Sequence, residues 1–357
     1  MIKRALFVIF GLLALCVLAF FVWPESRYQA YQVSAAYQKQ VDAFVVPEMP
    51  SDWQWSAFVG DDGIRMRWGQ TGNADAAKAT VVIVPGYTAT LDMYGEHVRD
   101  LAARGYHVLG FDLRGQGGSE RPRVGQPEKL LIDDFSRYSN ELSDFIQSRN
   151  LPENRPVIVM GMSFGGHVAA RMAGDHPETA DGLLLLAPAL KPKAGDMTFE
   201  EAAKLLTWGR KLGKDTRYLP GGSNWTPYNE QNLLQAGIEH CSSNPKRLPL
   251  RDAIFTRKPE QRVGDVTFNW GGEFYESSLY VRDAGYPESI GLPVTMIHAE
   301  LDNFVDTDEN KLICNTRMPN CQSLPIAGTG HCLPQESDAV LEEIFDALDG
   351  VLGRIQN

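Results

Sequence analysis

The sequence is poor in basic residues and contains no cluster of them. It holds 34 Lys and Arg residues against 45 Asp and Glu residues, so its formal net charge at neutral pH is -11. A nucleic-acid-binding surface is normally rich in Lys and Arg, and this composition excludes such a partner. The 33 glycines follow no fixed period and 10% of residues are aromatic, which excludes collagen-like and low-complexity chains. At 357 residues the chain has room for one large α/β domain or two smaller ones.

Cysteine is also scarce. Cys16 lies in an N-terminal apolar run, and four others follow: Cys241, Cys314, Cys321 and Cys332. Four cysteines allow three disulfide pairings, and four free thiols packed in a core are an equal alternative. Closure of a short loop favours a Cys314–Cys321 bridge, whereas a Cys241–Cys332 bridge would tie a central insertion to a C-terminal loop. The His-Cys pairs are adjacent in sequence and not spaced as zinc ligands are, so no metal site is predicted.

One long apolar run stands at the N-terminus. Residues 5–23 carry no charge, and this length is enough to span a bilayer as a helix. We predict a transmembrane anchor over residues 1–24, with a cleaved secretory signal as the alternative. Lys3 and Arg4 precede the run, so the positive-inside rule places the N-terminus in the cytoplasm and the remaining chain on the outer, periplasmic or extracellular, side. Residues 25–52 are predicted to be a juxtamembrane connector with a loose helical pattern at 27–45.

From residue 53 the sequence alternates apolar strands with helical patterns, which is typical of a doubly wound, mostly parallel sheet. This alternation of strands and helices is interrupted between residues 191 and 292. We therefore predict an α/β core made of residues 53–190 and 293–357, with an inserted, largely helical cap over residues 191–292. Strands are predicted at residues 55–59, 64–68, 80–84, 106–111, 157–160, 182–187, 293–298 and 322–326. Helices are predicted at residues 93–103, 130–148, 199–212, 230–239, 308–315 and 339–352, and directly after residue 163.

The most specific motif is Gly161-Met-Ser163-Phe-Gly165, which joins an apolar strand to a helical pattern. This context is typical of a nucleophile elbow, in which small flanking residues permit a strained central serine. The turn exposes the Ser163 hydroxyl at a helix N-terminus, whose dipole favours an anionic intermediate. We predict Ser163 as a catalytic nucleophile, with an idle serine in a glycine-rich turn as the alternative.

A serine nucleophile needs a general base, and that base needs a carboxylate to orient it. In this type of fold the acid follows the serine and the histidine comes last. His331 lies in a glycine-flanked loop after the last predicted strand, and Asp302 lies in the turn after the strand before it. We predict both as catalytic residues, with Glu300, Asp306 and Asp308 as the alternatives to Asp302.

Attack on a carbonyl forms an oxyanion, which two preorganised N–H groups would stabilise. We predict the backbone N–H of Phe164, directly after the nucleophile, and the backbone N–H of Tyr87 in the loop after the strand at residues 80–84. Gly86 would allow this loop to approach the substrate closely. An ordinary tight turn is the alternative for the loop.

These segments resemble the α/β-hydrolase fold, and most closely its lysophospholipase and monoacylglycerol lipase branch. The resemblance covers about residues 53–355 and rests on Val84-Pro-Gly-Tyr, Gly110-Phe-Asp112-Leu-Arg114-Gly-Gln-Gly-Gly-Ser119, Gly161-Met-Ser163-Phe-Gly-Gly166, the Asp302 loop and Gly330-His331. It implies a serine hydrolase that cleaves carboxyl esters of acyl lipids without a cofactor and binds the acyl chain under the cap. The branch usually has His-Gly at the oxyanion loop where this sequence has Pro85-Gly86, and because the donor is a backbone group this departure concerns the loop more than the chemistry.

Several alternatives stay open or are excluded. A dinucleotide loop at Gly115-Gln-Gly117 would need a third glycine at position 120, which is Glu. Epoxide hydrolases and dehalogenases of the same fold use an Asp nucleophile, which Ser163 argues against. A thioesterase or peptidase would use the same three residues, and a noncatalytic membrane scaffold is disfavoured because all three are present. The aromatic residues of the cap are expected to line an acyl pocket or to form the cap's own core: Trp208, Trp225, Phe268, Trp270 and Phe274.

Overall fold

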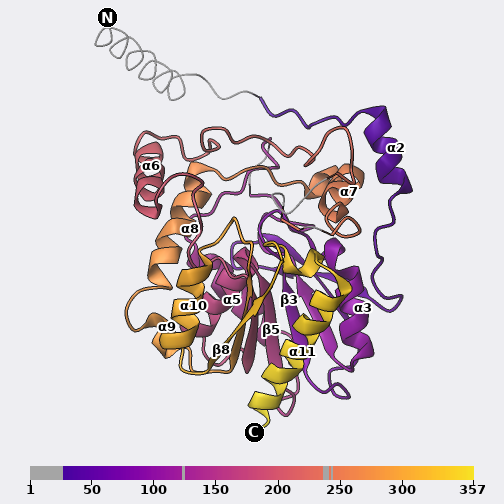
Figure 1. The fold of residues 1–357 in the computed structure, drawn as a ribbon, viewed down its shortest axis with the longest axis vertical. Helices are drawn as coiled ribbons and strands as arrows, with labels where there is room; N and C mark the ends of the chain where they lie inside the picture. The colour runs from indigo at the N-terminus through magenta and orange to yellow at the C-terminus, as the bar shows by residue number, and fades with distance from the viewer. Residues whose placement is uncertain (1–26, 123–124, 236–240, 243) are drawn as a thin grey trace, which may run out of the picture.

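The computed structural model describes residues 27–122, 125–235, 241–242 and 244–357 (Figure 1). Its centre is an eight-stranded sheet in the order β1-β2-β4-β3-β5-β6-β7-β8. β1 and β2 form an antiparallel hairpin at one edge, β2 is antiparallel to β4, and the strands from β4 to β8 run parallel. The strands are β1 (Gln54–Val59), β2 (Arg65–Thr71), β3 (Thr80–Val84), β4 (His107–Phe111), β5 (Val157–Met162), β6 (Gly182–Leu186), β7 (Val294–Ala299) and β8 (Cys321–Ile326).

Helices cover both faces of the sheet (Figure 1). One face carries α3 (Gly95–Ala103) and α11 (Asp338–Ile355), and the other carries α4 (Ser136–Gln147), α5 (Phe164–Asp175) and α10 (Thr307–Thr316). The segment between β6 and β7 contains α6 (Phe199–Lys211), α7 (Leu250–Arg257), α8 (Phe268–Tyr280) and α9 (Tyr286–Ser289). α2 (Ala35–Ala43) precedes the sheet, and short 3-10 turns are η1 (Leu91–Tyr94), η3 (Pro259–Gln261) and η4 (Leu333–Gln335).

β3 shows why the centre of the sheet is apolar throughout. Val81 and Ile83 pack into the cluster that contains α3 and α11, whereas Val82 and Val84 pack into the cluster that contains α4 and α5. Successive side chains of a strand point to opposite faces, so a strand covered on both faces needs apolar residues at every position. All eight predicted strands are present, and their ends lie within three residues of the predicted ones.

The predicted helix at residues 130–148 is wrong at its start, because α4 begins only at Ser136. The residues before it bond to a distant part of the chain. The Thr267 hydroxyl donates to Leu130 O at 2.8 Å, and the Ile132 N–H donates to Asn269 Oδ1 at 2.8 Å. These backbone groups are paired with the start of α8, and they are not available for a helical ladder.

The predicted helix at residues 230–239 is not found in its described part, which ends at residue 235. The Asn229 side chain accepts hydrogen bonds from the N–H groups of Gln231 and Asn232, at 2.9 and 3.0 Å. Such local turns compete with helix formation. Within the insertion, the helix predicted at residues 199–212 is present as α6, but α7 and α8 were not predicted individually.

The predicted anchor at residues 1–24 lies outside the described residues and stays a prediction. Within the described part of the chain, no helix has both the length and the apolar character needed to cross a membrane. In the predicted connector, Ser34 caps the start of α2, and its hydroxyl accepts the Tyr37 N–H at 3.1 Å. Tyr37 and Val41 are buried in one cluster with Leu233 and Ala253 of the insertion. The connector is therefore docked onto the insertion.

The four cysteines of the described chain form two disulfides, Cys241–Cys332 and Cys314–Cys321. The free-thiol alternative is therefore wrong. The Cys314–Cys321 bridge closes a short loop between α10 and β8. The Cys241–Cys332 bridge joins the insertion to the loop after β8, and the Cys332 N–H also donates to Cys241 O at 2.9 Å.

Candidate active site

Ser163 stands between β5 and α5 in a strained backbone conformation, with φ 51° and ψ -113°. A residue with a side chain rarely adopts a positive φ, so surrounding structure must enforce it. The Ser163 N–H donates to Leu186 O of β6, and Ser163 O accepts from the Ala189 N–H, both at 2.9 Å. These bonds hold the turn against the neighbouring strand, as the elbow motif predicts.

The glycines beside Ser163 make room for this turn. A Cβ atom on Gly161 would lie 2.6 Å from Gly165 O, and one on Gly165 would collide with the carbonyl oxygens of Val84 and Pro85. The helix can therefore start directly against β3 and β5 only because both positions lack a side chain. This packing places Phe164 at the first position of α5, where helical N–H groups have no partner within the helix.

The structure brings Ser163, His331 and Asp302 into one hydrogen-bonded chain. His331 Nε2 lies 2.7 Å from Ser163 Oγ, and His331 Nδ1 lies 2.6 Å from Asp302 Oδ2. Asp302 follows β7 and His331 follows β8, so both residues lie at the carboxyl ends of the parallel strands, where the elbow after β5 also lies. His331 and Asp302 are buried, with 6% and 5% of their surface exposed, while Ser163 is half-buried.

The environment of Asp302 keeps it ionised. Burial raises the pKa of its carboxyl, but the hydrogen bond from His331 and those from the Val305 and Phe304 N–H groups outweigh this, and the net pKa lies below its usual value. An ionised carboxylate can only accept hydrogen bonds, so His331 Nδ1 must carry the proton between them. His331 Nε2 is then free to accept the Ser163 proton, as a general base must.

The alternative carboxylates near Asp302 are engaged elsewhere. Asp306 pairs with Lys191 at 2.8 Å and accepts the N–H of Glu309, which caps α10. Glu300 accepts the Gly328 N–H at 2.8 Å. The Asp308 side chain lies in the first turn of α10 and is 98% exposed. Of the four carboxylates considered, Asp302 is the one that contacts the histidine.

The loop predicted to supply a second oxyanion donor passes directly beside Ser163. A Cβ atom on Gly86 would lie 3.2 Å from Met162 O and 3.3 Å from Ser163 Cβ. The backbone N–H of Tyr87 follows immediately. Its role as an oxyanion donor, like that of Phe164, stays a prediction.

Behind the elbow, the aromatic residues of α8 form packed core. The Phe164 ring packs edge-on against Trp270 at 5.1 Å between ring centroids, and Trp270 in turn contacts Phe274 at 5.1 Å. Trp270 and Phe274 are buried, as are Trp225 and Phe268, so these four belong to the core and do not line an open surface. Trp208 differs from them, because 64% of its surface is exposed.

Two residues at the site were not predicted from the sequence. The Phe304 ring packs against the His331 ring at 5.0 Å between centroids, yet 44% of Phe304 is exposed. Lys193 Nζ donates to Asp302 O at 2.7 Å and steadies the turn that carries the carboxylate. Phe304 lies two residues after Asp302, and the presence of an aromatic residue at that position is the one feature of the sequence that could have indicated its contact with His331.

The other histidine near the elbow is structural. His167 is fully buried, its Nδ1 lies 3.0 Å from Ala189 O, and its Nε2 lies 2.8 Å from Ser277 Oγ. Burial lowers its pKa to about 3, so it stays neutral at any ordinary pH. Within the described residues, no group of three or more His, Cys, Asp or Glu side chains is arranged to hold a metal ion.

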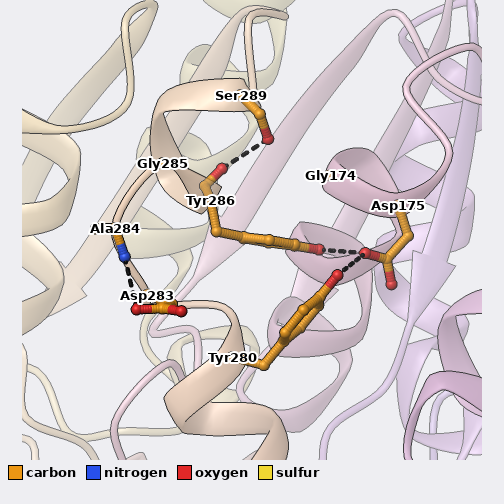
Figure 2. A pocket seen from close by; sticks show the side chains of 8 residues that line it. All are labelled: Gly174, Asp175, Tyr280, Asp283, Ala284, Gly285, Tyr286 and Ser289. Atoms are coloured by element: carbon orange, nitrogen blue, oxygen red, sulfur yellow. Dashed lines mark hydrogen bonds between the residues drawn. The ribbon is translucent and has the colours of Figure 1, made fainter.

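A cavity of about 510 Å³ lies at the C-terminal end of α5, the end opposite Ser163. Figure 2 shows the residues that line it. In it the Asp175 carboxylate accepts hydrogen bonds from the hydroxyls of Tyr280 and Tyr286, at 3.2 and 2.9 Å. Twelve helical residues span about 18 Å, so this cavity is separate from the Ser163 site. The groups in it satisfy one another, and we assign it no part in the chemistry.

The sequence matches the family described as serine aminopeptidase, S33, over residues 75–338. The chain belongs to this family. Lysophospholipase L2 of Escherichia coli (strain K12) is 25% identical over 317 residues, which cover 86% of this chain and 90% of that protein. A monoglyceride lipase structure from Saccharomyces cerevisiae aligns with a TM-score of 0.66 at 17% identity and covers 92% of this chain and 99% of its own. A monoacylglycerol lipase structure from Paleococcus ferrophilus aligns with a TM-score of 0.60 at 16% identity, covering 81% and 98%.

These relationships confirm two predictions from the sequence. The chain has the α/β-hydrolase fold, and it resembles the lysophospholipase and monoacylglycerol lipase branch of that fold. They also confirm that the protein is an ester-hydrolysing enzyme. At 17% and 16% identity the two solved structures show the fold alone.

Proposed function

We propose that the protein is a membrane-anchored serine hydrolase that cleaves carboxyl esters of acyl lipids, of the lysophospholipid or monoacylglycerol kind, through an acyl-enzyme. The observation that carries this proposal is the chain of two hydrogen bonds, 2.7 and 2.6 Å long, from Ser163 through His331 to Asp302. Ser163, at one end of these hydrogen bonds, is held at a positive φ, a conformation whose energetic cost a catalytic role would explain.

In the proposed reaction, Ser163 Oγ attacks the acyl carbonyl carbon while its proton passes to His331 Nε2. The carbonyl oxygen becomes an oxyanion that faces the N–H groups of Phe164 and Tyr87. His331 then gives the proton to the glyceryl oxygen, which leaves as an alcohol, and the acyl group stays on Ser163. Water repeats the sequence with His331 as base, which releases the fatty acid and restores Ser163. Asp302 stays ionised throughout and stabilises the imidazolium.

The preference for an acyl chain is supported by the surroundings of His331 and by the relatives. The half-exposed Phe304 ring offers an apolar surface beside the reacting groups. The relatives are named lysophospholipase L2 and monoglyceride lipase. We further propose that residues 191–292 form the cap over residues 53–190 and 293–357, as their position between β6 and β7 suggests.

We propose that residues 1–24 anchor the protein and that the enzyme works on the outer side of that membrane. The two disulfides support an oxidising compartment, because such bonds are rare in the cytosol. The connector supports a fixed attachment, since the Tyr28 hydroxyl donates to Glu128 at 2.9 Å and Arg262 donates to Tyr31 O at 2.9 Å. An uncleaved N-terminus in protein purified from membranes is the expected finding.

The test combines covalent labelling with a substrate panel. Wild-type protein should react with a fluorophosphonate probe, and Ser163→Ala should abolish labelling and reduce ester turnover at least about a thousandfold. Ser289→Ala, which removes an exposed serine far from the site, serves as the control. The panel holds a lysophospholipid, a monoacylglycerol, a thioester of the same acyl chain and an aminoacyl anilide. Labelling at another serine would contradict the site, and faster cleavage of the thioester or the anilide would contradict the substrate class.

A further inference from the structure

The loop beside Ser163 contains a second strained residue. Thr88, which directly follows Tyr87, has φ 56°. A β-branched residue is a marked outlier in this left-handed region, because its Cβ substituents clash with the backbone. The loop therefore needs partners that hold it in this conformation.

One such partner is Gln116. Its side-chain Oε1 accepts the Thr88 N–H at 2.8 Å, across 28 positions of sequence. Gln116 is buried, with 1% of its surface exposed, so water does not compete for this bond. The Thr88 N–H belongs to the peptide unit that follows Tyr87, and fixing that unit restricts rotation at Tyr87 itself.

Gln116 is itself held firmly. The turn that carries it follows β4, and the Gln116 N–H donates to Leu113 O at 3.1 Å while Gln116 O accepts the Ser119 N–H at 2.9 Å. The Arg121 guanidinium donates to the carbonyl oxygens of Gly115 and Gly117, on both sides of the residue. These bonds fix the backbone of the turn and thereby restrict the position of the Gln116 side-chain amide.

Tyr87 is held from the opposite direction as well. Its hydroxyl donates to Gly264 O at 3.1 Å, and its ring lies 4.6 Å from that of Trp270, both in the insertion. The insertion thus holds the side chain of Tyr87, and Gln116 holds the backbone just after it. These two attachments together fix the orientation of the Tyr87 N–H, which lies between them.

We propose that Gln116 is a positioning residue for ester hydrolysis, because it fixes the Tyr87 N–H where the oxyanion forms. This inference rests on the proposed function, in which Tyr87 supplies one of the two donors. A donor stabilises a transition state best when it is oriented before the reaction, so a mobile loop would reduce the rate of the chemical step and leave substrate binding nearly unchanged.

The test compares two substitutions of similar length. Gln116→Met keeps the bulk and loses the acceptor, and we expect kcat to fall roughly 10- to 100-fold with KM changed less than about threefold. The rate of fluorophosphonate labelling should fall by a similar factor, because the phosphonyl oxygen occupies the same position. Gln116→Glu retains an oxygen acceptor at the same position, and burial favours its neutral carboxyl form, so this variant should restore most of the wild-type kcat on the acidic side of the assay range.

Ser119→Ala is the matched control. It removes two hydrogen bonds of the same turn, one from the Ser119 hydroxyl to Asp112 O and one from the Arg67 N–H to Ser119 Oγ, and neither partner belongs to the Tyr87 loop. We expect it to lower the melting temperature about as much as Gln116→Met while kcat stays near the wild-type value. An unchanged kcat in Gln116→Met, or an equal fall of kcat in both variants, would overturn the positioning role and leave the proposed function intact. A wild-type protein that neither labels nor cleaves esters would overturn both.

Discussion

Replacing Asp302 with asparagine tests the link between the carboxylate and the tautomer of His331. Both Asp302 oxygens accept hydrogen bonds: Oδ2 from His331 at 2.6 Å, and Oδ1 from the N–H groups of Phe304 and Val305 at 2.8 and 2.9 Å. An asparagine has only one oxygen, so its NH₂ group must face one of these two sets of donors. If the NH₂ group faces His331, both backbone hydrogen bonds stay intact and only the hydrogen bond to His331 reverses its direction, so we expect that orientation.

In that orientation the asparagine NH₂ donates to His331 Nδ1, which must then be unprotonated. The proton moves to His331 Nε2, the atom that lies 2.7 Å from Ser163 Oγ, and it can no longer accept the serine proton. A triad with the wrong histidine tautomer loses about 10⁴-fold in kcat, which corresponds to about 5 kcal/mol of transition-state stabilisation. The fold should be preserved, because size and shape hardly change.

The assay is steady-state hydrolysis of a chromogenic acyl ester, with thermal unfolding measured in parallel. Asp306→Asn is the matched control, because Asp306 is an aspartate of the same loop, four positions after Asp302, that pairs with Lys191 and not with His331. We expect the control to keep kcat within a few-fold of wild type, roughly as an ion pair at a partly exposed site allows. A fall of less than tenfold in Asp302→Asn, or a greater fall in Asp306→Asn, would refute the tautomer argument.

Three further predictions concern stability and the disulfide. Cys332→Ser removes the bridge beside His331, and we expect kcat to fall up to about 100-fold through misplacement of the histidine. A reductant should lower kcat of the wild type by a similar factor. It should leave kcat of the variant nearly unchanged, because the Cys314–Cys321 bridge that the variant keeps joins α10 to β8 and does not hold the His331 loop. A wild-type kcat that does not respond to reductant would contradict this. Gly165→Ala forces a Cβ into the carbonyl groups of β3 and should cost about 1–3 kcal/mol in denaturant unfolding, whereas Gly350→Ala in α11, which meets no atom within 4 Å, should stabilise by about 1 kcal/mol. Burial lowers the folded-state pKa of His97, His167 and His298 to about 4, 3 and 4. Below pH 6.5 the unfolded chain therefore binds more protons than the folded one, and the free energy of unfolding decreases as the pH is lowered, by about 2 kcal/mol per histidine at pH 5. His167→Gln should reduce the slope of the unfolding free energy against pH by about 1.4 kcal/mol per pH unit near pH 5, the contribution of one proton, and an unchanged slope would contradict the assignment.

The strands were predictable because their signal is local. Every residue of β3, β5 and β7 is buried, and short, mostly apolar runs in the sequence mark all three strands. The elbow was predictable for a similar reason, since Gly161 and Gly165 stand beside Ser163 in sequence. Asp302 could be chosen because it follows β7 before α10 starts, whereas Asp306 already caps that helix.

What could not be predicted depends on contacts between distant residues. α4 starts late because Leu130 and Ile132 bond to residues near 268, and nothing in residues 130–148 indicates this. Gln116 stands in a glycine-rich turn that the sequence marks only as structural. Its partner Thr88 gives no sign of a positive φ, because threonine rarely adopts one.

The two disulfides differ greatly in what they do to the unfolded chain. Cys314–Cys321 spans 7 positions and restricts a loop that was already short, whereas Cys241–Cys332 spans 91. In the chain-entropy description, closing these loops lowers the conformational entropy of the unfolded state by the equivalent of about 2.3 and 4.6 kcal/mol. The longer ring contains α7, α8, β7, α10 and β8, so about a quarter of the protein unfolds as a closed loop. Under oxidising conditions the loop that carries His331 and the insertion therefore stay covalently close even in the denatured chain, and each refolding event begins with these two segments already joined.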